Sequence, residues 1–169
     1  TGISIIQLSP YLDAGDILLQ EKIKIYDDIY SDELTQKLKD LGMKLIIKIL
    51  PDIFQNKINI IKQDKINATY ASKFTTEDRK IDFNAPIEKV FNHIRAHGPK
   101  PGSWFTYRGE RIKILKAIKK NINKNKGIIL NKDFLIGCDG GSILPVLIQR
   151  EGKKAVSLKE FLSGFSFNV

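Results

Sequence analysis

Apolar residues follow two different spacings over the first part of the chain. Residues 3–8 and 17–25 hold short runs of isoleucine and leucine that predict strands, the first of them short enough to be buried. Over residues 31–50 the apolar positions recur every three or four residues, which predicts a helix that Pro51 ends or kinks. Its apolar stripe consists of Leu34, Leu38, Leu41, Leu45 and Ile49. Strand, loop, strand and helix in this order are typical of the closing portion of an α/β domain.

Short apolar runs separated by turn residues dominate the later part of the chain. Residues 86–97 differ, because their spacing predicts a second helix, which Gly98 ends. From Trp104, which we expect to anchor a small core, the pattern predicts a hairpin and further short strands. Strands are expected at residues 104–108, 111–117, 127–130, 134–138 and 142–149, with a loop at 119–126. Ser157 and Glu160 have the spacing of a capping box, which predicts a final helix.

Polar residues prevail between these two patterns, where the apolar periodicity fades. We therefore expect three parts: an α/β fragment over residues 1–56, a basic linker over 57–80 and an OB-like β-barrel over 81–169. The sequence begins at Thr1, without an initiator Met and with a strand already under way. We expect it to be a fragment of a longer protein.

The net charge of +9 comes from one block of the sequence. Residues 57–126 hold 17 Lys+Arg against 6 Asp+Glu, a surplus of 11, whereas the remainder holds 11 against 13. Such a field favours a polyanion, nucleic acid before an anionic membrane, although AT-rich genomes also encode lysine-rich proteins. Our candidates for contacts with nucleic-acid phosphates are Lys73, Arg95, Arg108, Arg111, Lys113, Lys116, Lys119, Lys120, Lys153 and Lys154.

Cysteine and histidine are scarce, which limits the chemistry to be expected. A single cysteine, Cys138, allows neither an internal disulfide nor a cysteine-cluster metal site. With no signal peptide and no apolar run long enough to span a bilayer, we expect a cytoplasmic protein without a membrane partner. His93 and His97 share a helix face, which a metal pair could use, but no HExxH pattern or acidic third ligand is nearby. We expect surface or cap histidines and no metal.

Two carboxylates, Asp13 and Asp16, lie in the loop between the first two predicted strands. Pro10 restricts the backbone of this loop, while Gly15 allows conformations that other residues avoid. A carboxylate held in this way can orient a catalytic base. Aspartate is equally common as a simple turn residue, so both interpretations stay open at this point.

Four segments in order resemble formyltransferases that use 10-formyltetrahydrofolate. The sequence Leu-Asp-x-Gly-Asp at residues 12–16 resembles their last active-site segment. Three further segments resemble signatures of methionyl-tRNA formyltransferases: Tyr-Ala-x-Lys through Ile-Asp at 69–83, Ile-Arg-Ala…Pro-x-Pro-Gly-Ser-Trp at 94–104, and Gly-Lys-Lys…Phe-Leu-x-Gly at 152–164. Phe83 stands where that family commonly has Trp. Together the four segments correspond to roughly the back half of such an enzyme. That half comprises the end of the Rossmann-like catalytic domain, the linker and the C-terminal barrel.

The resemblance implies formyl transfer from 10-formyltetrahydrofolate to the amino group of methionyl initiator tRNA, by a protein that we expect to be a monomer. It implies that Asp13 orients a catalytic histidine and raises its basicity. It also implies that Pro10, Tyr11, Leu12 and Asp13 line the pterin site and that Lys73 contacts the acceptor end of the tRNA. The family's catalytic Asn and His and its Ser-Leu-Leu-Pro segment lie upstream of the matched part. We therefore expect the 169-residue chain alone to be inactive.

Two alternatives remain open on the sequence. Sugar N-formyltransferases share the Leu-Asp-x-Gly-Asp segment, although they have less need of a basic linker and barrel. A non-catalytic OB-like nucleic-acid-binding module is the other alternative, with Asp13 as a turn residue. Asn-x-His and Ser-Leu-Leu-Pro motifs upstream in the reading frame would indicate the enzyme, and a start codon near Thr1 would indicate the module.

Overall fold

The computed structural model describes residues 1–64, 66–122, 125–127, 129–130 and 134–164. These residues form two compact units, which we describe one at a time. Unit 1 comprises Thr1–Ile29 and Glu33–Lys73, and unit 2 comprises Tyr30–Asp32 and Phe74–Val169. Within the described ranges, no helix combines the length and the apolar character that crossing a bilayer requires.

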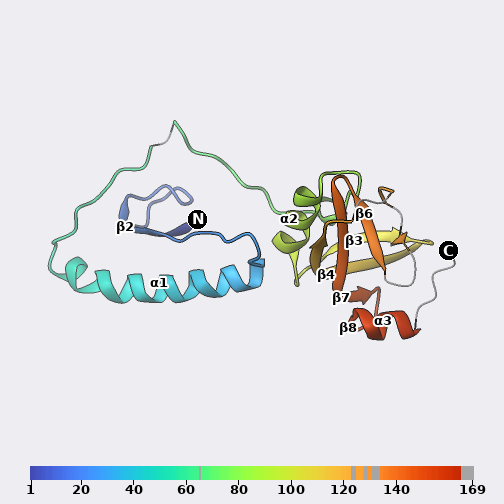
Figure 1. Cartoon of the computed structure of the whole chain (residues 1–169). Helices are drawn as coiled ribbons and strands as arrows, with labels where there is room; N and C mark the ends of the chain where they lie inside the picture. Colours follow the sequence, from blue (N-terminus) through green and yellow to red (C-terminus); the bar gives the residue numbers. More distant parts are fainter. Residues whose placement is uncertain (65, 123–124, 128, 131–133, 165–169) are drawn as a thin grey trace. The chain divides into compact units, whose positions relative to one another are not determined.

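Unit 1 is built from a hairpin and one long helix. Strands β1 (Gly2–Ile6) and β2 (Ile17–Lys22) pair antiparallel, and α1 (Ser31–Phe54) runs beside them (Figure 1). The helix turns its predicted stripe inward, since Leu45 and Ile49 are buried. The amphipathic pattern therefore predicted both the helix and its buried face.

The ends of the predicted elements in unit 1 need correction. Pro51 does not end the helix: α1 continues to Phe54, and the carbonyl of Pro51 accepts a hydrogen bond from Gln55 N at 3.1 Å. The residues after a proline keep their own N–H donors, so the turn that follows it can still close. Strand β1 is half-exposed rather than buried. Residues 23–25 are not a strand, although Ile23 N still donates to Thr1 O at 2.8 Å.

Unit 2 is a mixed α/β unit around an antiparallel sheet in the order β3-β4-β7-β6-β5, with β8 paired to β7. The strands are β3 (Ser103–Tyr107), β4 (Glu110–Lys120), β5 (Ile129–Leu130), β6 (Leu135–Cys138), β7 (Gly141–Arg150) and β8 (Ala155–Ser157). Helix α2 (Ile87–His97) packs against the sheet, and α3 (Leu158–Gly164) follows β8 (Figure 1). The predicted hairpin is β3–β4.

One apolar cluster holds unit 2 together. It joins α2 to the inward faces of β4, β6 and β7, and its members include Val90, Phe91, Ile94, Ile112, Ile114, Phe134, Ile136, Ile143 and Ile148. Tyr30 joins the cluster from far away in sequence, and its hydroxyl accepts from Ala117 N at 2.9 Å and donates to Ala117 O at 3.0 Å. The predicted capping box of α3 is confirmed, because Ser157 Oγ and Glu160 exchange hydrogen bonds.

Three predictions for unit 2 differ from the structure. Lys119 and Lys120 belong to the end of β4 rather than to a loop, and β8 was not predicted. Trp104 is buried but lies outside the apolar cluster, because its register partner on β4 is Lys113, on the face opposite Ile112 and Ile114. Among the described residues β3 and β5 are not paired with each other, so the OB-like barrel stays a prediction.

Candidate nucleic-acid interface

The loop between β1 and β2 is held by main-chain contacts. Asp13 adopts a left-handed backbone conformation with φ of 51°, which aspartate tolerates better than most residues. Gln63 Nε2 donates to Asp13 O at 2.8 Å and to Gly15 O at 2.5 Å. A side chain at Gly15 would collide with the carbonyl of Gln7, since its Cβ would lie 1.6 Å from that oxygen. The loop therefore has a defined shape that depends on glycine at position 15.

The side chains of this loop point outward. Tyr11 is 74 % exposed and Leu12 is 93 % exposed, and the Asp13 carboxylate is exposed as well. The loop therefore combines a defined backbone with outward apolar side chains. Unit 1 contains no histidine, so this unit does not itself supply the base that Asp13 would orient.

The two histidines differ from the prediction of surface or cap residues. His97 is buried, His93 is half-buried, and their rings lie 4.7 Å apart between centroids. His97 Nδ1 donates to His93 O at 3.0 Å, and no described residue pairs with the Nε2 atom of either ring. Burial lowers the pKa of His93 from its ordinary value; an interaction with the backbone of Arg79 opposes this, and the charge of His97 adds to the lowering. No group of three or more metal-binding side chains occurs in the described part of the chain.

Most candidate basic residues are scattered over unit 2. Arg95 on α2 donates to Asn92 Oδ1 at 2.8 Å, and Lys116 lies over the Tyr30 ring. Lys119 is paired with Glu88 at 2.6 Å, so its charge is already compensated. Arg108 lies in the β3–β4 turn, Lys120 at the end of β4, Lys153 and Lys154 before β8, and Lys73 at the end of unit 1. Seven of these eight candidates thus lie in unit 2, on α2, on β4, in the β3–β4 turn and before β8, and Lys73 lies in unit 1.

Two candidates, Arg111 and Lys113, do form part of a cluster. They lie two residues apart on β4 and pair in register with Thr106 and Trp104 of β3, so all four side chains share one face of the hairpin. The Arg111 guanidinium carbon lies 4.2 Å from the centre of the Trp104 ring. Arg111 and Lys113 have no ion pair among the described residues.

Lys80, which the sequence did not single out, completes this cluster. Its ammonium lies 5.6 Å from the centre of the Trp104 ring, and the next residue, Ile81, donates from N to Trp104 O at 2.7 Å. Trp104 Nε1 in turn donates to Thr76 O at 2.8 Å. The position of Lys80 directly before the Ile-Asp pair of the 69–83 segment could have marked it as a candidate in the sequence. We call Lys80, Arg111 and Lys113 around Trp104 the basic cluster.

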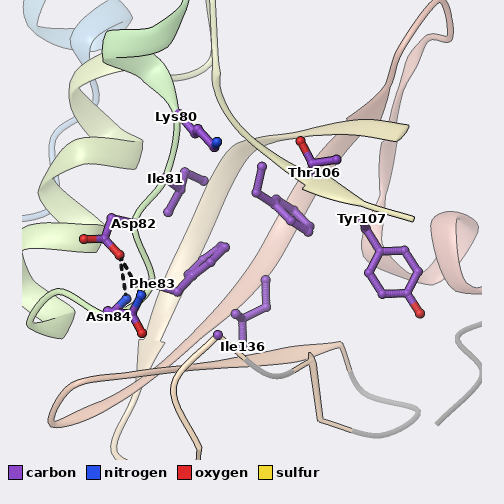
Figure 2. Close-up of a pocket in the computed structure, with 10 residues that line it drawn as sticks. Lys80, Ile81, Asp82, Phe83, Asn84, Thr106, Tyr107 and Ile136 are labelled. Atoms are coloured by element: carbon purple, nitrogen blue, oxygen red, sulfur yellow. Dashed lines mark hydrogen bonds between the residues drawn. The ribbon is translucent and has the colours of Figure 1, made fainter. Parts of the chain in front are cut away.

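A pocket of about 410 Å³ opens next to the basic cluster. Residues 80–84 line one side, with Thr106 and Tyr107 of β3 opposite them and Ile136 below Phe83 (Figure 2). Phe105 of β3 and Gly127 also line the pocket. Lys80 lines this pocket and also belongs to the basic cluster. The two features are therefore neighbours on unit 2.

The sequence matches a known family over most of unit 2. Residues 73–166 match the model of the formyl transferase C-terminal domain. The chain therefore belongs to the formyl transferase family, as the sequence motifs indicated. Solved structures agree on the fold, for example HypX from Aquifex aeolicus in complex with tetrahydrofolic acid, at 15 % identity and a TM-score of 0.79 over 99 % of this chain and 31 % of that one.

Curated relatives are more similar in sequence. Methionyl-tRNA formyltransferase of Pelagibacter ubique is 34 % identical over 97 % of this chain and 53 % of the relative. The enzyme of the same name from Rickettsia prowazekii is 36 % identical over 97 % of this chain and 54 % of the relative. The chain thus spans about half the length of these relatives. Another solved structure of similar fold is the N-formyltransferase from Helicobacter canadensis in complex with folinic acid and dTDP-3-aminofucose, which is 23 % identical with a TM-score of 0.68 over 88 % of this chain and 55 % of that one.

Proposed function

We propose that this chain is the carboxyl-terminal half of a methionyl-tRNA formyltransferase, which transfers a formyl group from 10-formyltetrahydrofolate to initiator tRNA in the cytoplasm. The observation that carries the proposal is the 34–36 % identity to enzymes of that name over nearly the whole chain. The basic cluster adds support, because its cations have no ion pair within the described ranges and such cations suit the phosphates of a tRNA.

In the proposed reaction, the α-amine of the tRNA-bound methionine attacks the formyl carbon. A new carbon–nitrogen bond forms, the bond from the formyl carbon to N10 of the folate breaks, and the proton lost by the amine passes to a base, which then protonates the departing N10. Asp13 would orient the histidine that acts as this base, and main-chain groups of Pro10–Asp13 would hold the pterin. The histidine and an asparagine that stabilises the oxyanion would come from the half of the enzyme that precedes the matched part.

Unit 2 would bind the tRNA backbone through the basic cluster. We also propose that its sheet is the wall of an OB-like barrel, a fold that often presents nucleic acid on its surface. Contacts from lysine and arginine to phosphates position a nucleic acid without reading its sequence. Binding should therefore weaken steeply as salt is added.

Binding of labelled initiator tRNA to the chain over a salt series tests the tRNA assignment. The double variant Arg111→Gln/Lys113→Gln should reduce the slope of log K against log salt by about 1.5, since each lost phosphate contact removes roughly 0.7–0.9. The matched control is Lys89→Gln/Lys159→Gln, which changes the same charge at exposed lysines outside the cluster. Equal effects of the two variants, or no binding of tRNA at low salt, would contradict the assignment and favour a sugar N-formyltransferase.

A hybrid enzyme tests the catalytic assignment. The chain alone should show no formyl transfer, whereas its fusion to the amino-terminal half of the Rickettsia prowazekii relative should restore it. In the hybrid, Asp13→Asn should lower kcat by at least about tenfold, because the histidine would lose the carboxylate that holds its tautomer and orientation. Asp27→Asn, at another exposed aspartate of unit 1, is the control. Unchanged kcat in the Asp13 variant would make Asp13 a turn residue.

A further inference from the structure

The pocket beside the basic cluster has the chemistry of a site for a single nucleotide. Its floor is apolar, formed by Ile81, Phe83, Phe105 and Ile136, and the rings of Phe83 and Phe105 meet edge to face at 5.5 Å. Its rim is polar (Figure 2), formed by Lys80, Asp82, Asn84, Thr106 and Tyr107. A nucleobase has the same two characters, an apolar face and polar edges. The volume of about 410 Å³ lies within the range of roughly 300–1,000 Å³ that is common for ligand pockets.

The amide of Asn84 is fixed in a position from which it can bind the edge of a base. Asp82 Oδ1 accepts hydrogen bonds from Asn84 N at 3.0 Å and from Asn84 Nδ2 at 3.1 Å. One N–H and the Oδ1 atom of Asn84 then remain for a ligand. A donor and an acceptor side by side are the pair that an asparagine offers to a base edge. The Asp82–Asn84 contact is drawn in Figure 2.

A cation next to the pocket provides a place for the phosphate. Lys80 is exposed, lines the pocket and lies over the Trp104 ring, and Arg111 lies over the same ring. A base in the pocket would therefore have its phosphate within the field of two cations. A base inside a duplex cannot enter such a pocket, because its edges are paired and its faces are stacked. The site suits a nucleotide that has left the stack.

We propose that this pocket binds one unpaired nucleotide of the tRNA, with the base against Phe83 and Phe105 and the phosphate at Lys80. The proposal rests on the proposed function for the source of the nucleotide. It adds a base-dependent contact to the phosphate contacts of the basic cluster. Asn84 determines which base is preferred, because its amide is the oriented polar group of the rim.

Trp104 makes the proposal measurable, since it is the single tryptophan of the chain and lies under Lys80 and Arg111. The probes are the four ribonucleoside 5′-monophosphates, with ribose 5-phosphate and inorganic phosphate as ligands without a base. We expect saturable quenching of Trp104 fluorescence by at least one nucleotide, at concentrations about tenfold lower than for ribose 5-phosphate. Equal affinity for all six ligands would overturn the proposal, since a bare anion site would then explain the binding.

The rim variant Asn84→Ala should weaken binding of the preferred nucleotide about threefold to tenfold, as expected for one lost hydrogen bond. Asn121→Ala, at another exposed asparagine of unit 2, is the matched control, and a thermal melt checks that both variants fold. The same pair is then tested with initiator tRNA. Weaker tRNA binding by Asn84→Ala alone supports the proposal. If Asn84→Ala binds tRNA as tightly as the parent chain, the assignment of the pocket is overturned and the proposed function stands. If the parent chain binds nucleotides but no tRNA, the proposed function is overturned.

Discussion

The helices α1 and α2 both have an apolar face, yet their surroundings differ. In unit 2, α2 buries Val90, Phe91 and Ile94 against the sheet. In unit 1, α1 buries Leu45 and Ile49 while Met43 is 58 %, Ile47 70 % and Phe54 81 % exposed. Apolar side chains on several faces of a helix are typical of a helix covered on more than one side.

Unit 1 exposes further apolar surface in its first loop and beside its helix. Leu8 and Leu12 of unit 1 are both more than nine-tenths exposed, and an apolar groove runs between Ile3 of β1 and Leu38, Gly42 and Met43 of α1. Contiguous exposed apolar surface usually marks a place that another part of a protein covers. Unit 2 therefore has the core of an independent domain, whereas unit 1 exposes apolar surface of the kind that another part of a protein usually covers. This agrees with the relatives, which are about twice as long as the chain.

The largest effect that would sharpen this comparison comes from the core of unit 2. Ile112 is fully buried, so Ile112→Ala should lower the free energy of unfolding of unit 2 by about 2–5 kcal/mol. Ile47→Ala in unit 1 is the matched substitution and should change stability by less than about 0.5 kcal/mol, because Ile47 is largely exposed. Urea unfolding followed by circular dichroism measures both. Similar losses for the two variants would contradict the difference between the units.

A smaller effect is expected at Tyr30, which belongs to unit 2 despite its position in the sequence. Tyr30→Phe keeps the ring but removes the hydroxyl that bonds both Ala117 N and Ala117 O, and should cost about 1–3 kcal/mol. Tyr70→Phe is the control, since Tyr70 is 98 % exposed. Thermal unfolding followed at the Trp104 fluorescence compares them. A Tyr30 variant as stable as the control would show that this anchor does not matter for unit 2.

The smallest effect is a pH dependence confined to unit 2, which holds both histidines. Burial lowers the pKa of His93 in the folded state, so above its ordinary value of about 6.5 the residue is neutral in both states. As the pH falls through that value the unfolded chain takes up a proton first, and the free energy of unfolding decreases until the folded pKa is passed.

We expect the Tm of unit 2 to decrease between about pH 7.5 and 5.5, and His93→Gln to reduce this decrease. Carboxylates with lowered pKa values, such as Glu110 beside Arg150, lose their stabilising contribution only at lower pH. The protection factors of the α1 amides in unit 1, which are exchange rates corrected for the intrinsic pH dependence of amide exchange, should not change over the same window. A Tm that is constant over this range in the parent chain would contradict the buried position of the histidine pair.

The sequence by itself determined the local elements and the family. Periodicity placed α1 and α2, the Ser157–Glu160 spacing placed the start of α3, and the motifs identified the formyl transferase family. These features depend on neighbours within a few residues, or on stretches of sequence compared directly. The sequence could not show that the helix continues beyond Pro51, because that depends on how well its last turn is otherwise bonded.

The tertiary structure decided which residues meet. The spacing of His93 and His97 put them on one face, but only the packing of α2 shows that this face is buried. Likewise, nothing in the sequence favoured Arg111 and Lys113 among the ten candidates for phosphate contacts. The register of β3 and β4 places both beside Trp104, where Lys80 from another segment also lies. Which residues are buried and which side chains touch depends on contacts between segments far apart in the chain. Local patterns of polarity do not predict these contacts residue by residue.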